Sequence, residues 1–330
     1  MNWVQKHRRL SIATVAAASL GMGGCIEYRI ETTLNADGSG VRSEKMIVQE
    51  FEDEADNAAF RADFGYLMFA TADFRWAYEQ EMDDDDTVHV FLRETQVQNH
   101  DAWADLSDNV QIAGAAVAGT DSRIGSVRLG DVRFRNKVRL ESGRVTEGTS
   151  FTYRETFYWE NLAEALVEYI VEEYTNAVVE RYPDLTSAQR GELIGLATGS
   201  VWFAVDQGLF EASGDEEDEL VSALSERTAS QAVRIVRRRY PDAGEEFFAN
   251  LLQQIYDDDD AFEEFIMRQL PGVQLAINSE IVFWLNMPGR VLASNAHDRD
   301  GNTLIWEFAP GDALTAPLEI YAESLVERDR

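Results

Sequence analysis

The sequence predicts an α+β fold, in which a mainly antiparallel β domain formed by both ends of the chain contains an inserted all-α helical domain. This prediction depends on the period of the apolar residues. Apolar and polar side chains alternate over residues 26–158 and again after residue 272, which is typical of half-buried strands. Over residues 160–270 the apolar residues instead recur with the period of a helix that buries one face.

We therefore expect four segments along the 330-residue chain. They are a signal peptide (1–24), the first part of the β-rich domain (25–158), a helical insertion (159–271) and the last part of the β-rich domain (272–330). Hydrophobic residues make up 45% and aromatic residues 11% of the sequence, which is enough to build cores and excludes wholesale disorder. The two ends of an inserted domain usually lie close together, so the flanking β segments can form one domain.

The first 25 residues have the pattern of an export signal that ends in a lipid attachment site. Lys6, Arg8 and Arg9 precede the apolar stretch 10–20, and small residues then lead to Cys25. A charged start, a short apolar core and small residues before a cleavage site are typical of a secretory signal. Small residues that end in Cys resemble the lipobox of bacterial and archaeal lipoproteins, whose Cys carries acyl chains such as palmitate and becomes the mature N-terminus.

We expect lipidated Cys25 to anchor the mature protein on a membrane, facing the periplasm or the cell exterior. Two acyl chains on one residue give stable anchoring, at about 0.8 kcal/mol for each buried methylene group. Cys25 is the only cysteine, so neither an intramolecular disulfide nor a cysteine-based metal site can form. A plain secretory signal with a chance cysteine is the alternative, and the pair Arg8-Arg9 leaves twin-arginine export open.

The charge of the chain excludes one class of partner. Sixty Asp and Glu against 29 Lys and Arg give a net charge of −31, and removal of residues 1–24 takes away three positive charges to leave −34. Nucleic acid is therefore not an expected partner, because phosphate backbones bind basic surfaces. A strongly acidic surface whose mature chain keeps only Lys45 and Lys137 suits a salt-rich medium, although a high-GC genome would also replace Lys with Arg.

The first β-rich segment begins with a hairpin. Two alternating stretches flank the turn at residues 35–40, where Asp37-Gly38 is a strong hairpin signal. The further elements expected in this segment are a helix over 51–72, strands on either side of a turn at 83–86, a short helix at 101–108, and strands near 110–119, 131–141 and 145–158.

The helical insertion shows regular helix signals. Its first helix is marked by apolar residues at four-residue spacing, namely Leu162, Leu166, Ile170, Tyr174 and Val178. Capping boxes at 186–189 and 213–216 mark two later helix starts, and Arg237, Arg238 and Arg239 occupy the last turn of the helix after the second box.

One motif occurs twice in this region. The sequence Arg-Tyr-Pro-Asp stands at residues 181–184 and again at 239–242, each time after a long helix and before another one. The repetition predicts two helical hairpins, and Pro271-Gly272 ends the helical region.

The helix that follows the first capping box carries glycines at every fourth position, at Gly191, Gly195 and Gly199. Small residues at this spacing permit close contact with another helix, so we expect this apolar helix at the centre of the insertion. Alternatively, its apolar residues, which include Trp202, line an apolar ligand pocket between the insertion and the sheet.

After residue 272, Pro288-Gly289 and Asp300-Gly301 mark turns between further strands. Cys25 followed by a strand and the hairpin at 35–40, together with the tail at 287–308, resembles the LppM-type envelope lipoproteins. This resemblance implies a secreted, lipid-anchored α+β protein without catalysis that binds a lipid-like or glycolipid ligand or an envelope protein partner. The membrane is then the expected partner of the acyl anchor.

The sequence carries no motif that predicts catalysis or a cofactor. A nucleophile elbow, phosphate-binding glycine loops and a metalloprotease motif are all absent. The three mature histidines (His89, His100 and His297) are widely separated, and the acidic runs at 83–86 and 257–260 read as turn and helix-start residues. We therefore expect no catalytic, cofactor or metal site. The alternative is a lipid-anchored hydrolase whose acid pair or histidine site is assembled only in the fold.

Four cations form an unexpected row in this acidic chain. Strand alternation places Arg133, Arg135, Lys137 and Arg139 on one face of a strand. Cross-strand pairing with acids would explain them, and each such pair would contribute a few tenths of a kcal/mol. The functional interpretation is contact with an anionic head group or sugar phosphate.

We predict that Cys25→Ser abolishes acylation and moves the protein from the membrane fraction to the soluble fraction. Fractionation before and after a high-salt wash measures this, since salt removes proteins that are held only by surface charge. A Ser variant that stays membrane-bound after the wash would contradict the lipobox.

Overall fold

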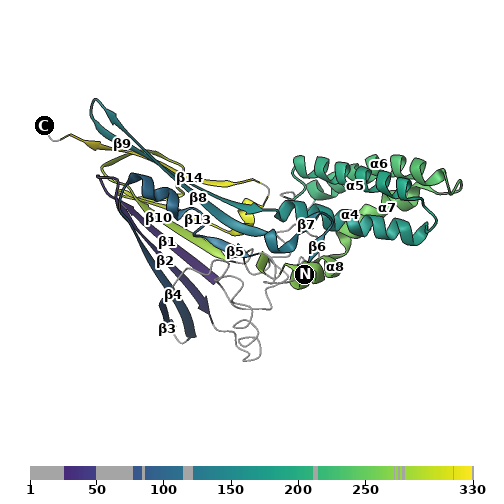
Figure 1. Ribbon diagram of the computed structural model, residues 1–330, viewed down its shortest axis with the longest axis horizontal. Helices are drawn as coiled ribbons and strands as arrows, with labels where there is room; N and C mark the ends of the chain where they lie inside the picture. The colour runs from purple at the N-terminus through teal and green to yellow at the C-terminus, as the bar shows by residue number, and fades with distance from the viewer. Residues whose placement is uncertain are drawn as a thin grey trace, which may run out of the picture. The chain divides into compact units, whose positions relative to one another are not determined.

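The computed structural model describes the residues that carry the two predicted domains, and Figure 1 shows its ribbon. The described residues are 26–49, 77–83, 86–113, 122–210, 215–270, 272–273, 276, 279–314 and 316–328. They divide into two compact units. We call them the β unit, whose described residues lie within 26–113, 133–160 and 272–328, and the helical unit, whose described residues lie within 122–132 and 161–270.

The β unit is built from two sheets. The larger sheet has seven strands in the order β12-β13-β10-β1-β2-β4-β3, and the smaller has five in the order β11-β14-β9-β8-β5. The strands of the larger sheet are β1 (Ile26–Leu34), β2 (Gly40–Gln49), β3 (Ala77–Asp83), β4 (Asp86–Val97), β10 (Glu280–Asn286), β12 (Asp298–Asp300) and β13 (Thr303–Phe308). Those of the smaller sheet are β5 (Gln111–Ala113), β8 (Arg133–Val145), β9 (Gly148–Glu160), β11 (Arg290–Ser294) and β14 (Leu318–Glu327).

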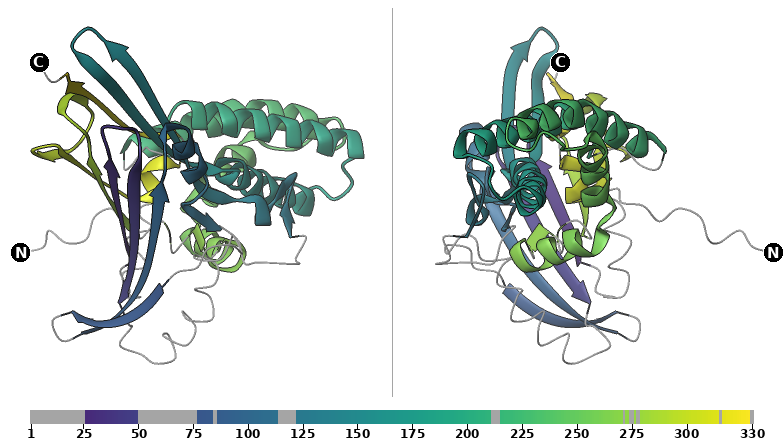
Figure 2. Two further views of the ribbon diagram at one scale, coloured as in Figure 1. Left: turned by 60° about the vertical axis from the view of Figure 1, so that its left-hand side comes forward. Right: turned by 90° about the vertical axis from the view of Figure 1, so that its right-hand side faces the viewer.

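Both chain ends contribute to both sheets, which confirms the predicted α+β class. Strand β10 lies parallel to β1, with Ile30 opposite Phe283, and every other pair in this sheet is antiparallel. In the smaller sheet β14 pairs with β9 along its whole length. The predicted hairpin at 35–40 is present, and the long hairpin of β8 and β9 is seen clearly in Figure 2.

Aromatic side chains fill the interior of the β unit. Because alternate residues of a strand point to one face, Tyr153, Phe157 and Phe283 all turn inward and are almost fully buried. The ring centroids of Phe157 and Phe283 lie 6.3 Å apart in an edge-to-face arrangement, which joins the two sheets. Trp103, from the 3-10 helix His100–Leu106, covers one end of this core and donates a hydrogen bond of 2.9 Å to the Gly38 carbonyl. The short helix expected at 101–108 is therefore present.

A charged cluster lies in the same interior. Arg42 of β2 donates two hydrogen bonds to the Glu155 carboxylate of β9, of 3.1 Å and 2.8 Å, and both side chains are 0% exposed. Glu155 also accepts hydrogen bonds from Asn136 and from the Tyr153 hydroxyl. Burial alone would lower the pKa of Arg42, but Glu155, Tyr153 and Glu44 together outweigh this and hold the pKa above its usual value, so Arg42 stays charged.

In the part of the chain that the structure describes, the helical unit contains five α-helices. They are α4 (Leu162–Arg181), α5 (Ser187–Asp206), α6 (Asp215–Arg237), α7 (Glu245–Asp257) and α8 (Asp259–Gln269). Contacts join α4 to α5, α5 to α6, α6 to α7 and α7 to α4, so these four helices close a bundle. Helix α8 packs on α4 through Tyr169 and Phe265, whose stacked ring centroids are 4.3 Å apart.

Local signals fixed several helix ends as predicted. The capping box at 186–189 is complete, since Thr186 accepts from the Gln189 amide and the Gln189 side chain accepts from Thr186. Within the predicted acidic run at 257–260, Asp258 caps α8 by accepting from the Ala261 amide. Residues 300–301 form the predicted turn between β12 and β13.

Other expectations differ from the structure. Gly191, Gly195 and Gly199 do not meet another helix among the described residues, because a Cβ atom built on any of them would have open space around it. Helix α6 ends at Arg237, so Arg238 and Arg239 lie beyond the last turn. Residues 122–132, assigned from sequence to the β-rich segment, belong to the helical unit. The helix expected over 51–72 and the start of the capping box at 213–216 lie outside the described residues.

We predict that Arg42→Met lowers the free energy of unfolding by about 3–5 kcal/mol, because the buried Glu155 would lose its ion-pair partner and two hydrogen bonds. Urea denaturation of the Cys25→Ser protein measures this change. The double variant Arg42→Met/Glu155→Leu should lose less stability than the single variant, since it removes both charges. Equal stability of the wild type and Arg42→Met would contradict a buried ion pair.

A second prediction concerns Tyr174 of α4. Its hydroxyl is buried in the helical unit without a hydrogen-bond partner among the described residues. We expect Tyr174→Phe to keep or raise stability, by up to about 1 kcal/mol, because the variant no longer buries an unpaired hydroxyl. A clear loss of thermal stability would mean that the hydroxyl has a partner.

Candidate functional site

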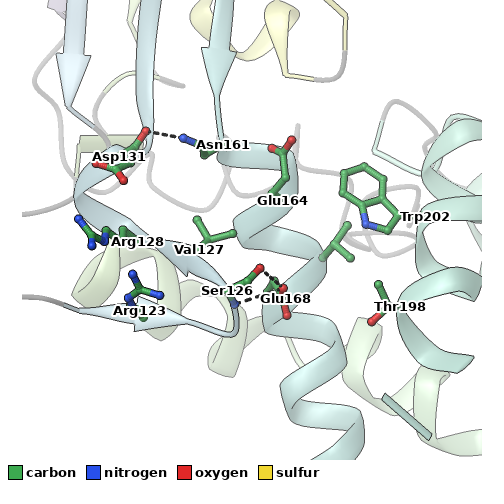
Figure 3. Close-up of a pocket in the computed structure, with 11 residues that line it drawn as sticks. Arg123, Ser126, Val127, Arg128, Asp131, Asn161, Glu164, Glu168, Thr198 and Trp202 are labelled. Atoms are coloured by element: carbon green, nitrogen blue, oxygen red, sulfur yellow. Dashed lines mark hydrogen bonds between the residues drawn. The ribbon is translucent and has the colours of Figure 1, made fainter. Parts of the chain in front are cut away.

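A cavity in the helical unit is the candidate functional site, and Figure 3 shows it. Its volume is about 420 Å³. Three parts of the unit supply its walls: the hairpin of β6 (Arg123–Ile124) and β7 (Val127–Arg128), the first half of α4, and one face of α5. The side chains that carry its chemistry are Arg123, Arg128, Asp131, Asn161, Glu164, Glu168, Thr198 and Trp202.

The hairpin is fastened to α4 through its turn. Glu168 accepts hydrogen bonds from the Ser126 amide (3.3 Å) and the Ser126 hydroxyl (2.6 Å). Gly125 adopts φ +51°, and a Cβ atom there would lie 2.0 Å from a carboxylate oxygen of Glu168. The backbone conformation favours glycine here, and a side chain would displace the Glu168 carboxylate from Ser126. Ile124 is buried beside the turn and keeps the hairpin against the helical unit.

The start of α4 forms the next wall. Asn161 precedes the helix in the left-handed conformation (φ 61°), which Asn tolerates better than most residues. Its side chain donates a 3.0 Å hydrogen bond to the Asp131 carbonyl, so it ties the chain after the hairpin to the beginning of α4. Glu164 follows in the first turn of α4, where the helix macrodipole favours an acidic side chain.

Helix α5 supplies the remaining wall through Thr198 and Trp202. They lie four residues apart, so both point to the same side of α5. In Figure 3 the Trp202 indole faces the side of the cavity that carries Glu164, and the two arginines lie on the hairpin beyond α4. Trp202 thus gives the cavity an aromatic surface, and Val127 and Val167 add further apolar lining beside the polar and charged groups.

The charges of the cavity nearly cancel. Arg123 and Arg128 are positive, and Asp131, Glu164 and Glu168 are negative. Glu168 already accepts two hydrogen bonds from Ser126, so Glu164 is the carboxylate with the greater capacity to bind a ligand. The cavity therefore offers hydrogen-bond donors, hydrogen-bond acceptors and an aromatic ring together.

The predicted basic row lies on β8, and Arg135 and Arg139 of this row are paired with acids. Arg135 binds the carboxylates of Asp108 and Glu160, with a closest distance of 2.7 Å to each. Arg139 lies 2.8 Å from Glu141, while Arg133 and Lys137 stand opposite residues 160 and 156 of β9. None of the four residues lines the cavity beside Trp202, or a second cavity of the helical unit that is described below. This geometry favours the pairing interpretation for Arg135, and the contact with an anionic ligand stays a prediction.

The other candidate residues are scattered. Cys25 lies outside the described residues, as does the side chain of His89. His100 lies beside Asp101, and His297 accepts a hydrogen bond from the Glu307 amide. In the described part of the chain, no group of three or more His, Cys, Asp or Glu side chains is arranged to hold a metal ion.

Sequence reasoning missed most of this cavity. It named Trp202 only among the apolar residues of its helix and gave an apolar pocket between the insertion and the sheet as an alternative. The cavity that Trp202 lines instead has both polar and apolar walls and is formed by residues of the helical unit. The hairpin at 123–128 was not predicted at all. Its signal is present in the sequence Arg-Ile-Gly-Ser-Val-Arg, where Gly-Ser separates two short stretches, but strands of two residues are too short for alternation to be recognised.

Comparison with known proteins gives one structural match. No family model and no curated protein matches the chain. Among solved structures, the NMR structure of the folded domain of Mycobacterium tuberculosis LppM matches over 99% of this chain and 97% of that chain, at 8% identity and a TM-score of 0.27.

A likeness at this TM-score transfers neither ligand nor activity, so we derive both from the residues of this chain. In the parts of the chain that the structure describes, no helix combines the length and the apolar character needed to cross a membrane.

Proposed function

We propose that this protein is a secreted, lipid-anchored envelope protein without catalysis, and that the cavity beside Trp202 binds the sugar head group of a glycolipid. The observation that carries the proposal is the composition of this cavity, whose lining combines charged groups of both signs with one aromatic ring.

A neutral polyhydroxyl ligand suits this composition best. Each sugar hydroxyl both donates and accepts a hydrogen bond, so it can use the carboxylate of Glu164 and the guanidinium groups of Arg123 and Arg128. A strong anion would meet three carboxylates, and a strong cation would meet two guanidinium groups. Trp202 offers an apolar face to the carbon atoms of a sugar ring. The volume of about 420 Å³ lies within the range of about 300–1,000 Å³ that is usual for small-molecule sites.

The lipid anchor would make such binding efficient. Acylation of Cys25 would hold the protein on the membrane that contains the glycolipid, so a modest affinity would suffice because the effective concentration of the head group is high. The LppM-type resemblance supports this class of ligand. The acidic surface would not bind anionic lipids without help, which leaves specificity to the cavity.

The hydrolase alternative has less support. An acid pair needs two carboxyl groups that are free to reach a substrate. Among the acids that line the cavity, Glu164 and Glu168 are the nearest to each other in the sequence. Glu168, however, holds the hairpin through Ser126. An envelope protein as partner would leave the cavity without a role.

We predict that Trp202→Ala reduces glycolipid binding about tenfold or more, as expected for the aromatic anchor of a binding site. Native extraction from the host membrane followed by mass spectrometry of co-purifying lipids measures the bound ligand, and Glu164→Gln should also reduce it. The matched control is Phe203→Ala, because Phe203 follows Trp202 in the chain, is 45% exposed and does not line the cavity.

Two results would contradict the proposal. One is lipid that co-purifies equally with the wild type, Trp202→Ala and Phe203→Ala. The other is turnover of an extracted glycolipid by the wild type that Glu164→Gln abolishes, which would favour the hydrolase.

A further inference from the structure

The repeated motif of the helical unit forms a second site, separate from the cavity beside Trp202. The two copies of Arg-Tyr-Pro-Asp lie between α4 and α5 and between α6 and α7. The structure brings them together: the ring centroids of Tyr182 and Tyr240 are 5.0 Å apart, and the Asp184 amide donates a 2.9 Å hydrogen bond to the Tyr240 hydroxyl oxygen. Equivalent residues of the two helical hairpins thus face one another.

A cavity of about 520 Å³ lies where the two copies meet. Both copies contribute their arginine and tyrosine to its walls, as Arg181, Tyr182, Arg239 and Tyr240. Gly244 also lines it and leaves the space beside its backbone open.

The two turns that form this cavity are held by hydrogen bonds from arginine side chains to backbone carbonyls. Arg190 of α5 donates to the carbonyls of Pro183 (2.8 Å) and Leu185 (3.2 Å) in the first turn. Arg237 of α6 donates to the Ala243 carbonyl (2.9 Å) in the second turn. Because both turns are fixed in this way, a ligand would find the cavity already formed and would not have to order it.

The two cavity arginines have no carboxylate partner among the described residues. Arg181 packs over the Phe247 ring, 4.7 Å from its centroid, and both Arg181 and Arg239 are exposed to solvent. Their neighbour Arg238, which does not line the cavity, is bound to Glu192 at 2.7 Å. Two exposed cations beside one cavity are notable in a chain of net charge −31.

We propose that this cavity binds a phosphoryl group between Arg181 and Arg239. A phosphoryl group presents several equivalent oxygens, which match two guanidinium groups placed at equivalent positions. The Tyr240 hydroxyl accepts from the Asp184 amide, so its own proton is free to be a third donor. Asp242 is the one acid of the wall and leaves the local charge positive. The acidic remainder of the protein weakens phosphoryl binding only slightly, since charges more than about 8 Å away are largely screened at physiological salt.

The phosphoryl group could come from free phosphate or from a phospholipid head group, and the experiment distinguishes these sources. The Cys25→Ser protein is titrated with inorganic phosphate in one arm. In the other arm it is mixed with phosphatidylcholine vesicles that contain or lack phosphatidic acid. Saturable phosphate binding without vesicle binding indicates the free ion, and vesicle binding that requires phosphatidic acid indicates the lipid.

In whichever arm shows binding, Arg181→Gln and Arg239→Gln should each reduce affinity about tenfold, as expected for the loss of a charge-assisted hydrogen bond. Arg238→Gln is the matched control and should bind like the wild type. Thermal unfolding verifies that the variants fold, which is expected because these arginines are exposed. No saturable binding in either arm, or equal binding by the Arg181→Gln/Arg239→Gln and Arg238→Gln proteins, would overturn the proposal. Neither of these two outcomes concerns the cavity beside Trp202. The phosphoryl proposal can therefore be wrong while the glycolipid proposal holds.

Discussion

The buried ion pair of Arg42 and Glu155 constrains how the two sheets of the β unit can pack. If the sheets met in another alignment, Glu155 would be buried without Arg42, and Arg42 would keep only Glu44 of its own strand, 3.5 Å away. Around this pair, Asn136 and Tyr153 complete the hydrogen bonds of Glu155, and Phe283 lies close to the guanidinium of Arg42. The aromatic core supplies the apolar area that drives packing, whereas the charged cluster favours one register over its neighbours.

The helical unit is held by contacts between neighbouring helices and between their connecting turns. Its four-helix bundle closes through contacts between neighbouring helices, and its two connecting turns share one motif that locks them together through Tyr182 and Tyr240. Both cavities described here lie in this unit. The first is completed by a hairpin fastened to α4, and the second is made by the turns themselves, so each takes its shape from short connections that are held by hydrogen bonds.

Local signals made much of the fold predictable. Strand alternation, the hairpin at 35–40 and the capping box at Thr186 each act over a few residues, and all are present. The glycine spacing in α5 predicted a contact that the described residues do not make, because spacing alone does not say which face of a helix is buried. Neither cavity could be located in advance, since Ser126 meets Glu168 and Asp184 meets Tyr240 only through the tertiary structure.

The parallel pairing of β1 with β10 has a consequence for how the chain reaches its native state. Most of the sequence, including the whole helical unit, separates Ile30 from Phe283. A central strand of the larger sheet therefore stays without one neighbour until almost the entire chain has been synthesised. Such distant pairing raises the contact order and slows folding. Unpaired strand edges are also prone to aggregate, so binding of the newly made chain by chaperones would be an advantage before the sheet is completed.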